Sequence, residues 1–218
     1  MRINKYIALA TGMSRRAADS ILGHGRVRVN GQTPLPGYDV QGAEKVTLDG
    51  KTITIDVQLT TIMLNKRIGF VSSRDGQGDK TIYNLIPENL HHLKPVGRLD
   101  KYSSGLLLMT NDGKMAHELT HPSFQKQKVY EVELSKELMP EHRQIIQNNG
   151  VLLDDGPSHF TIQPAKDGKT WKISLKEGRN RQIRRTFEAL GYGVTRLHRV
   201  QFGPYQLGSL APGEYKNI

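Results

Sequence analysis

An aspartate directly before an apolar run is the first feature of this sequence that could do chemistry. The stretch reads GRLDKYSSGLLLMTNDG, in which Asp100 precedes the run Leu106–Met109. Such a run predicts a buried strand, so the carboxylate is expected where a loop enters the protein interior. Two roles are open for Asp100: a reactive carboxylate, or a side chain that braces the loop through local hydrogen bonds beside Ser103 and Ser104.

A second candidate is the arginine-rich stretch EGRNRQIRRTFEALGY. Its apolar residues recur at the spacing of one helix face, which predicts a helix over Arg181–Leu190 that Asn180 can cap. Positive charge at the start of a helix is costly, because the helix dipole is already positive there. The sequence therefore predicts an anionic partner, either RNA phosphate or a buried carboxylate; an ordinary solvated helix face is the alternative. The arginines concerned are Arg179, Arg181, Arg184 and Arg185.

The stretch QKQKVYEVEL places an aromatic ring on a predicted strand, next to positive charge. Tyr130 lies among strand-forming valines, and Lys126 and Lys128 precede it. Most tyrosines on strands fill half-buried surface, so packing is one interpretation. The other is an aromatic face that stacks on a base that has left its helix, with the lysines facing RNA.

The stretch HELTH matches the H-E-x-x-H pattern of zinc peptidases, in which two imidazoles one helical turn apart bind the metal and the glutamate activates water. Pro122 directly follows His121 and biases it away from helical dihedral angles, so the second histidine is expected at or beyond the helix end. The following residues, PSFQKQ, supply no third ligand at the extended spacing. We therefore expect solvated histidines, His117 and His121, at a helix end and no bound metal.

A small module of two helices and several strands is expected over residues 1–56. Ile3 and Ile7 have helical spacing, and Ser14 can cap a second helix. RVRVNGQ and VTLDGKTITI then predict strands with tight Asn-Gly and Asp-Gly turns. The basic residues of the module would suit a surface that follows a phosphate backbone, although a solvated face explains them equally well. They include Arg2, Lys5, Arg15 and Arg16.

After a linker predicted at residues 57–60, longer strands and intervening helices predict a larger domain over residues 61–218. Strands are expected in TIMLNK, LLLMT, KVYEVEL, SHFTIQPA and KTWKISL, and two further helices over Lys114–Leu119 and Glu141–Gln147. Strands and helices do not alternate strictly. The predicted fold class is therefore α+β, with a mostly antiparallel sheet.

The composition limits the classes of protein to which the chain can belong. Its 218 residues carry a formal net charge of +10 and include no cysteine, which excludes disulfides, iron–sulfur clusters and thiol catalysis. The positive balance favours polyanionic partners, nucleic acid before a membrane surface. The basic N-terminus lacks the apolar core of a signal peptide, and no run approaches the roughly 20 apolar residues of a membrane span. We expect a soluble, cytoplasmic protein.

The motifs and their order resemble one family over nearly the whole chain, the bacterial ribosomal RNA pseudouridine synthases of the RsuA and RluB type. GRLDKYSSGLLLMTNDG resembles the family's catalytic motif, which implies that Asp100 is the essential aspartate. KVYEVEL resembles the strand that carries a base-stacking tyrosine, here Tyr130. EGRNRQIRRTFEALGY resembles the motif whose arginine or lysine pairs with the aspartate, here Arg184.

The resemblance extends to both ends of the chain. RINKYIALATGMSRRAADSILGHGRVRVNG resembles the small RNA-binding domain named after ribosomal protein S-four, and LHRVQFGPYQLGSLAPGEY resembles the family's closing segment. One departure is Arg67 in NKRIG, where the family usually has proline, so the local turn there is open. We further expect RNA contacts from Arg98, Arg179 and Arg181, besides the basic residues of the N-terminal module.

The activity that the resemblance implies is the isomerisation of a uridine in ribosomal RNA to pseudouridine. The uracil is cut from the ribose, turned and rejoined through carbon-5, which needs no redox change or group donor, so no cofactor and no metal are expected. NRQIRR favours large-subunit RNA as the target. A small-subunit enzyme and a non-catalytic RNA-binding or ribosome-assembly protein are the alternatives. A monomer that binds ribosomal RNA or a ribosomal precursor particle, and no membrane, is expected.

Overall fold

The computed structural model describes residues 1–56, 58–165 and 168–218. By its internal contacts the chain forms two compact units, Met1–Leu59 and Thr60–Ile218. The boundary between them falls within the segment 57–60 for which a linker is predicted; Val57 of that segment lies outside the described residues. Within the described ranges, no helix is both long and apolar enough to cross a membrane.

The N-terminal unit contains two helices and a three-stranded antiparallel sheet. Gly12, with φ of 76°, ends the first helix, and the Ser14 hydroxyl accepts a hydrogen bond from the Ala17 amide at 3.1 Å and so caps the second. Ile3 and Ile7 are buried in the core that the helices share with the sheet. The elements are α1 (Ile3–Thr11), α2 (Arg15–Gly23), β1 (Val27–Val29), β2 (Val46–Leu48) and β3 (Lys51–Thr52).

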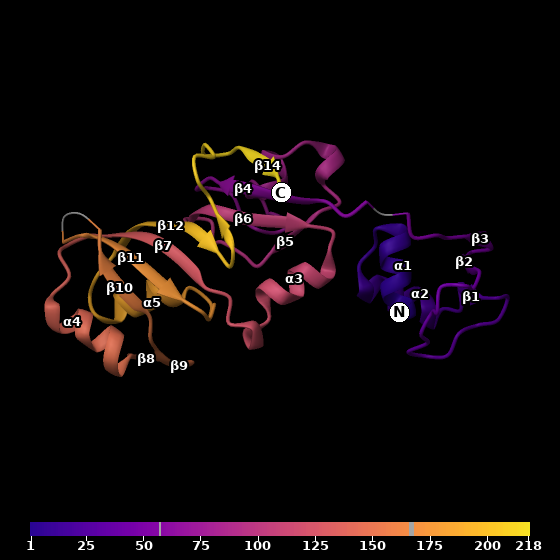
Figure 1. The fold of residues 1–218 in the computed structure, drawn as a ribbon, viewed down its shortest axis with the longest axis horizontal. Helices are drawn as coiled ribbons and strands as arrows, with labels where there is room; N and C mark the ends of the chain where they lie inside the picture. The colour runs from indigo at the N-terminus through magenta and orange to yellow at the C-terminus, as the bar shows by residue number, and fades with distance from the viewer. Residues whose placement is uncertain (57, 166–167) are drawn as a thin grey trace. The chain divides into compact units, whose positions relative to one another are not determined.

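The C-terminal unit is built on one large sheet with the strand order β10-β11-β7-β12-β6-β4-β14, to which β13 adds beside β12 and β5 beside β6 (Figure 1). β12 and β6 run parallel, whereas the other strand pairs described in this sheet are antiparallel. The predicted α+β class with a mostly antiparallel sheet is confirmed. The strands are β4 (Thr61–Lys66), β5 (Lys94–Val96), β6 (Ser104–Thr110), β7 (Lys128–Leu134), β10 (Thr161–Pro164), β11 (Thr170–Leu175), β12 (Val194–Phe202), β13 (Tyr205–Gln206) and β14 (Tyr215–Asn217).

Helices pack on both faces of this sheet. Phe187 of α5 and Ile146 after α4 belong to the core on one face, and Leu119 of α3 belongs to the core on the other. A separate hairpin of two short strands precedes β10. These elements are η1 (Ile82–Leu85), η2 (Glu88–Leu90), α3 (Gly113–Thr120), η3 (Pro122–Phe124), α4 (Pro140–Gln144), η4 (Ile145–Asn149), β8 (Val151–Leu153), β9 (Gly156–Ser158) and α5 (Gln182–Ala189).

The central strand β6 explains the unbroken apolar run LLLM. Leu107 and Met109 contribute to the core on one face of the sheet, while Leu106 and Leu108 contribute to the core on the other. A strand covered on both faces needs apolar side chains at every position, so it shows no alternation with polar residues. The start of β6 is also close to β12, because a Cβ atom at Gly105 would lie 2.3 Å from the Arg199 carbonyl oxygen. β6 is therefore a rigid base for the loop that precedes it.

Three local predictions differ from the structure. Asn180 does not cap α5: the residue before the helix is Arg181, in a left-handed conformation (φ 46°, ψ 29°), and Arg185 Nε donates to the Asn180 carbonyl at 2.8 Å. The helix predicted over Glu141–Gln147 is the short α4 followed by a π-helical turn, η4. SHFTIQPA contains the last residue of β9 and the whole of β10, with a break between them.

Candidate active site

Asp100 lies in the loop between β5 and β6, and the backbone of this loop is fixed by the surrounding protein. Five successive carbonyl groups, from Leu99 to Ser103, accept hydrogen bonds from groups outside the loop. In the order of those carbonyls, the donors are Ser72 Oγ, Lys66 Nζ, the Gly69 amide, Arg184 Nη2 and again Lys66 Nζ. A reactive side chain on such a loop is held in one place before any substrate binds.

Lys66, at the end of β4, is the most deeply buried of these donors. Its ammonium group donates to the carbonyls of Arg67, Asp100 and Ser103 at 3.1, 3.0 and 2.7 Å, which uses all three of its protons. Burial lowers the pKa of Lys66 to about 8, against the opposing effect of the Asp100 charge. Sequence reasoning missed this residue, although a lysine at the end of the apolar strand TIMLNK is a signal that could have found it.

The Arg184 guanidinium, predicted to pair with the Asp100 carboxylate, forms no ion pair with it within 4 Å, although the negative charge of Asp100 opposes the lowering of its pKa. Its guanidinium donates to the Tyr102 carbonyl at 2.7 Å and to the Val194 carbonyl at 2.8 Å, so it ties α5 to the Asp100 loop and to β12. Partial burial lowers its pKa, and the positive charge of Arg181 adds to that effect. Arg184 thus holds the loop backbone rather than the reactive side chain.

The guanidinium within ion-pair distance of Asp100 belongs to Arg181. Its Nη1 lies 3.8 Å from Asp100 Oδ2, and both side chains keep more than a third of their surface exposed. Arg181 is the left-handed residue that directly precedes α5. An ion pair between Asp100 and an arginine is therefore present, but the arginine is Arg181 and not the predicted Arg184.

Asp100 and Arg181 share a cavity of about 520 Å³ with Tyr130. Tyr130 lies on β7, is 9% exposed and faces Arg199 of β12 in the sheet register. The cavity has the size of a small-ligand site. An aromatic ring and a carboxylate in one cavity of this size can hold a planar base against the ring, with its ribose toward the carboxylate.

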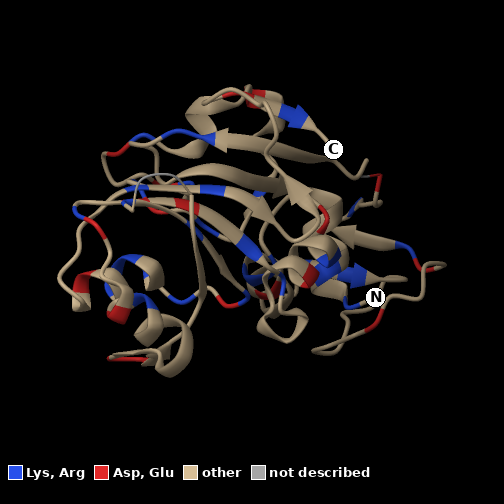
Figure 2. Cartoon of the chain, turned by 60° about the vertical axis from the view of Figure 1, so that its left-hand side comes forward, with Lys and Arg blue, Asp and Glu red and all other residues tan. Residues whose placement is uncertain are grey.

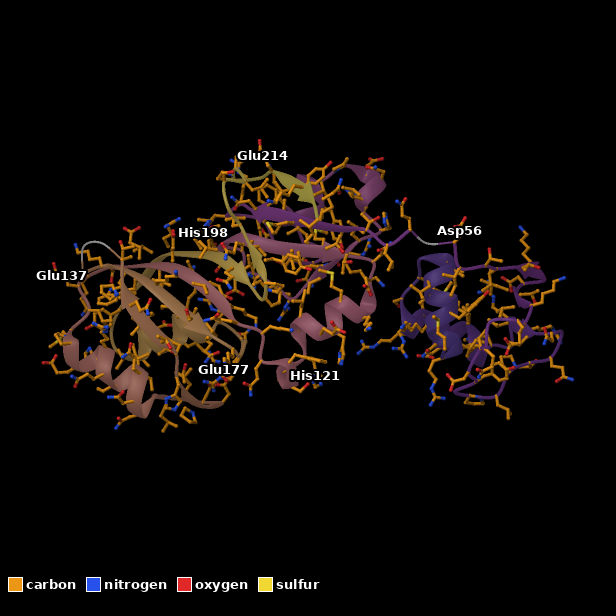
Figure 3. The ribbon with its side chains drawn as sticks, viewed as in Figure 1. Asp56, His121, Glu137, Glu177, His198 and Glu214 are labelled. Carbon is orange, nitrogen blue, oxygen red and sulfur yellow. The ribbon has the colours of Figure 1, made fainter. Side chains whose placement is uncertain are left out.

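Positive charge dominates the lining of this cavity. Seven lysine and arginine side chains face two carboxylates, those of Asp100 and Glu177; Figure 2 shows how Lys and Arg recur along the strands and loops of this unit, and Figure 3 places Glu177 and His121, which both line the cavity. Five of the cations form no ion pair with a carboxylate in the described part of the chain, and we call them the cavity cations. They are Arg98, Lys126, Lys128, Lys176 and Arg199.

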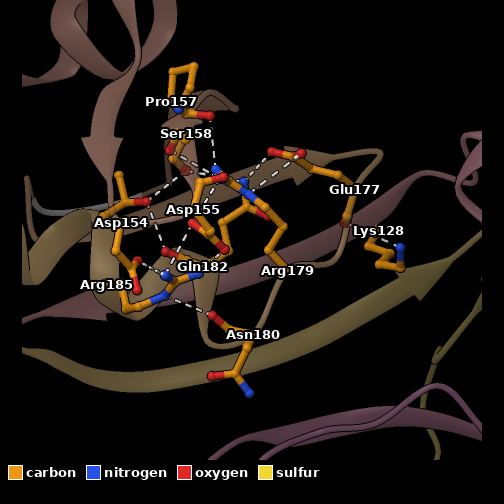
Figure 4. A network of polar contacts seen from close by, with 12 residues as sticks. Lys128, Asp154, Asp155, Pro157, Ser158, Glu177, Arg179, Asn180, Gln182 and Arg185 are labelled. Atoms are coloured by element: carbon orange, nitrogen blue, oxygen red, sulfur yellow. Dashed lines mark hydrogen bonds and ion pairs between the residues drawn. The ribbon is translucent and has the colours of Figure 1, made fainter.

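Arg179 and Arg185 have a different environment, which we call the arginine clamp (Arg179, Arg185, Asp154 and Asp155; Figure 4). Asp155, in the turn of the β8–β9 hairpin, accepts from Arg179 Nη1 at 2.9 Å and from Arg185 Nη2 at 2.7 Å, and Asp154 accepts from Arg185 Nη1. The hydrogen bond from Arg185 is the main reason that the pKa of Asp155 is lowered. Arg179, for which an RNA contact is predicted, is instead occupied within the protein.

The predicted helix end at HELTH is present, with His117 inside the helix and His121 directly after it. α3 ends at Thr120, and His121 has an extended ψ of 132°. The two imidazole rings are tilted by 51° to one another with centroids 4.8 Å apart, and His121 Nδ1 lies 2.8 Å from Ser123 Oγ. Among the described residues, no group of three or more His, Cys, Asp or Glu side chains could hold a metal ion.

The basic residues predicted to contact RNA in the N-terminal unit are mostly on its surface. Arg2 donates to the Gly37 carbonyl and lies 3.8 Å from Asp39, and Arg15 donates to Asn4 Oδ1 at 3.1 Å. Three of them are exposed and the fourth is half-buried; in chain order they are Arg2, Lys5, Arg15 and Arg16.

A family model described as RNA pseudouridylate synthase matches residues 60–189, which include the Asp100 loop and all of α5. The chain is 36% identical over its full length to ribosomal large subunit pseudouridine synthase B of Pseudomonas aeruginosa, of which it spans 59%. It is 30% identical over its full length to the protein of the same name in Bacillus subtilis, of which it spans 91%.

A solved structure gives the same result for the fold. A crystal structure of a pseudouridylate synthase superimposes with a TM-score of 0.72 and 29% sequence identity, over all of this chain and 96% of that one. With the family model covering more than half of the chain, the conclusion is direct: the protein belongs to the RNA pseudouridylate synthase family.

Proposed function

We propose that the protein converts a uridine of large-subunit ribosomal RNA to pseudouridine, with Asp100 as the catalytic carboxylate. The observation that carries this proposal is the cavity that joins Asp100 to Tyr130 and to Arg181. The names of the Pseudomonas and Bacillus relatives favour the large subunit. A target in the small subunit is the alternative that the experiment below separates.

The site supplies the groups that the reaction requires. Tyr130 would stack on the uracil once the target nucleotide has left its helix, at a cost of a few kcal/mol. Asp100 is held beneath the base by its fixed loop, and Arg181 lies beside it. Contacts between RNA phosphates and the cavity cations, of which Arg98 is exposed, would offset the cost of removing the base from the stack.

The N-terminal unit would add a second RNA contact. Its two helices and small sheet carry Arg2, Lys5, Arg15 and Arg16, for which we infer a role in following the phosphate backbone. We infer further that the protein acts as a monomer in the cytoplasm, where its substrate would be ribosomal RNA or a precursor particle.

The test is tritium release from ribosomal RNA labelled at carbon-5 of uridine. The wild type should release tritium, and Asp100→Asn should slow release by about 10³-fold, because the reactive carboxylate is lost while the shape is kept. Asp56→Asn is the matched control, since Asp56 is an exposed aspartate in the other unit, and it should keep the wild-type rate. Equal rates for wild type and Asp100→Asn would remove Asp100 from the reaction.

Mapping of pseudouridines then identifies the substrate. RNA from ribosomes made without the protein is treated with wild-type enzyme, and new pseudouridines are located in both subunits. A new modification in large-subunit RNA supports the proposal, and one confined to small-subunit RNA replaces it by the alternative.

A further inference from the structure

Arg199, on β12, is a buried cation whose hydrogen bonds are incomplete. The residue is 2% exposed. Its Nε donates to the Leu106 carbonyl at 2.8 Å, which fixes the guanidinium against β6. Nη2 is buried and has no hydrogen-bond acceptor among the described residues. A buried donor without an acceptor is costly, so its persistence suggests an acceptor that arrives with a ligand.

The charge of Arg199 is also uncompensated. Two cations lie over the ring of Phe202, Arg199 at 4.9 Å and Lys128 at 5.5 Å from its centroid. Neither cation has a carboxylate within ion-pair distance in the described part of the chain. Arg199 adds to the effect of burial in lowering the pKa of both Lys128 and Lys66. Positive charge is therefore concentrated at this wall of the cavity, where Glu177 acts on Lys128 only from beyond ion-pair distance.

The position of Arg199 directs this charge toward the place of the base. Arg199 and Tyr130 are direct partners in the register of β12 and β7, and both line the cavity that contains Asp100. A base stacked on Tyr130 would thus have the guanidinium of the neighbouring strand at its edge.

The reaction produces negative charge at that edge. When the bond between ribose C1′ and uracil N1 breaks with its electrons on the base, the base becomes a uracil anion whose charge is shared by N1 and the two carbonyl oxygens. The electrons of the anion form the new bond from C5 to C1′, after which the proton on C5 is lost to water and N1 takes up a proton, so that the product is an isomer of the substrate. A fixed donor with positive charge beside a carbonyl oxygen would stabilise the anion more than the bound uridine, which is the requirement for acceleration.

We propose that Arg199 donates from its terminal nitrogens to a carbonyl oxygen of the detached uracil and stabilises that base as an anion. This inference rests on the proposed function and adds a second catalytic residue to the site. It differs from a contact between Arg199 and an RNA phosphate, which would strengthen binding without favouring bond cleavage.

The test compares uridine with 5-fluorouridine at the target position of one synthetic RNA. Fluorine already stabilises the uracil anion, so the help of Arg199 matters less for that substrate. Consumption of the target nucleoside is followed by nuclease digestion and chromatography in single turnovers, with the enzyme saturating so that binding does not limit the rate. Arg199→Gln should slow uridine consumption by about 100-fold and 5-fluorouridine consumption by about 10-fold or less.

Two further variants keep the result interpretable. Arg196 lies on the same strand, is partly exposed and pairs with Glu131 at 3.1 Å. The control variant Arg196→Gln should change both rates less than about 2-fold. Arg199→Lys, which keeps the positive charge, replaces Arg199→Gln if that variant does not fold. It should also slow uridine consumption more than 5-fluorouridine consumption, by a smaller factor.

The outcomes distinguish the two levels of the proposal. If Arg199→Gln slows the consumption of both substrates equally, the arginine supports the structure or binds phosphate, and the inference is overturned while the proposed function stays intact. The same holds for Arg199→Lys if only that variant folds. A wild type that consumes neither substrate overturns the proposed function and the inference together.

Discussion

The arginine clamp and the cavity cations lie close to the same stretch of chain at the start of α5, and they differ in how their positive charge is compensated. In the clamp, Asp155 binds both Arg179 and Arg185 at hydrogen-bond distance. The cavity cations, such as Arg98 and Arg199, have no carboxylate partner in the described residues. Charge that is neutralised within the protein stabilises the local fold, whereas charge that is left open is available to an anionic substrate.

Lys66 shows a third arrangement, because carbonyl dipoles rather than carboxylates surround its ammonium group. It holds the backbone of the Asp100 loop through two of these carbonyls and is not among the residues that line the cavity. The cations of this unit therefore have three different roles. Lys66 and Arg184 hold the catalytic loop, the clamp holds the start of α5, and the cavity cations face the substrate.

The largest effect is expected from Lys66→Met. At neutral pH the loss of three hydrogen bonds to buried carbonyls should lower the free energy of unfolding by about 1–3 kcal/mol. The pKa of Lys66 is about 8 in the folded protein against 10.5 for an ordinary lysine, so between these values the unfolded chain binds more protons. The wild type should then gain up to about 3 kcal/mol over the variant as the pH rises from 8 to 10.5.

Urea unfolding at several pH values measures this difference. Below pH 8 the gap between wild type and Lys66→Met should be constant, since lysine is protonated in both the folded and the unfolded chain. Lys114→Met, at an exposed position, is the control and should show no such widening. A gap that stays flat or narrows above pH 8 would show that Lys66 is not held as a buried ammonium group.

Much of this framework could be predicted from the sequence, because it depends on local patterns. The apolar run predicted β6, the helical spacing predicted α5, and Ser14 predicted the start of α2. The family pattern also indicated Asp100 and Tyr130, which the fold brings to one cavity. The three elements follow from periodicity and caps, which a short stretch of chain determines by itself, whereas the two site residues follow from the family resemblance.

The assignment of partners could not be predicted, because it depends on residues that are distant in sequence. Nothing in EGRNRQIRR indicates that Asp155, in a separate hairpin, would take Arg179 and Arg185 and leave Arg181 for Asp100. The same holds for Arg184, whose two carbonyl acceptors lie on the Asp100 loop and on β12. Four arginines of one motif are chemically alike until the fold selects a partner for each.

A smaller effect should separate the two groups of cations in RNA binding. Arg98→Gln removes an open charge, so the slope of log binding constant against log salt concentration should fall by about 1. Arg185→Gln removes a charge that Asp154 and Asp155 already neutralise, and its slope should match that of the wild type. Both are arginine-to-glutamine changes in the same unit, so each serves as the other's control.

Binding of target RNA at several salt concentrations gives both slopes. Equal decreases for Arg98→Gln and Arg185→Gln would contradict the division into clamp and cavity cations, because they would mean that the clamp opens and releases its arginines to RNA. A decrease only with Arg185→Gln would reverse the assignment altogether.

The smallest effect is expected at Arg181, although it is the arginine nearest the Asp100 carboxylate. The pair is 3.8 Å apart and partly exposed on both sides, and such pairs contribute less than about 1 kcal/mol. Arg181→Asn is the suitable change, since asparagine tolerates the left-handed conformation at this position. Its single-turnover rate should fall by about 2- to 5-fold at unchanged stability, because Lys66 and Arg184 still hold the loop. A loss of more than about 100-fold would instead place Arg181 with Asp100 in the chemical step and remove the distinction between residues that fix the loop and residues that face the substrate.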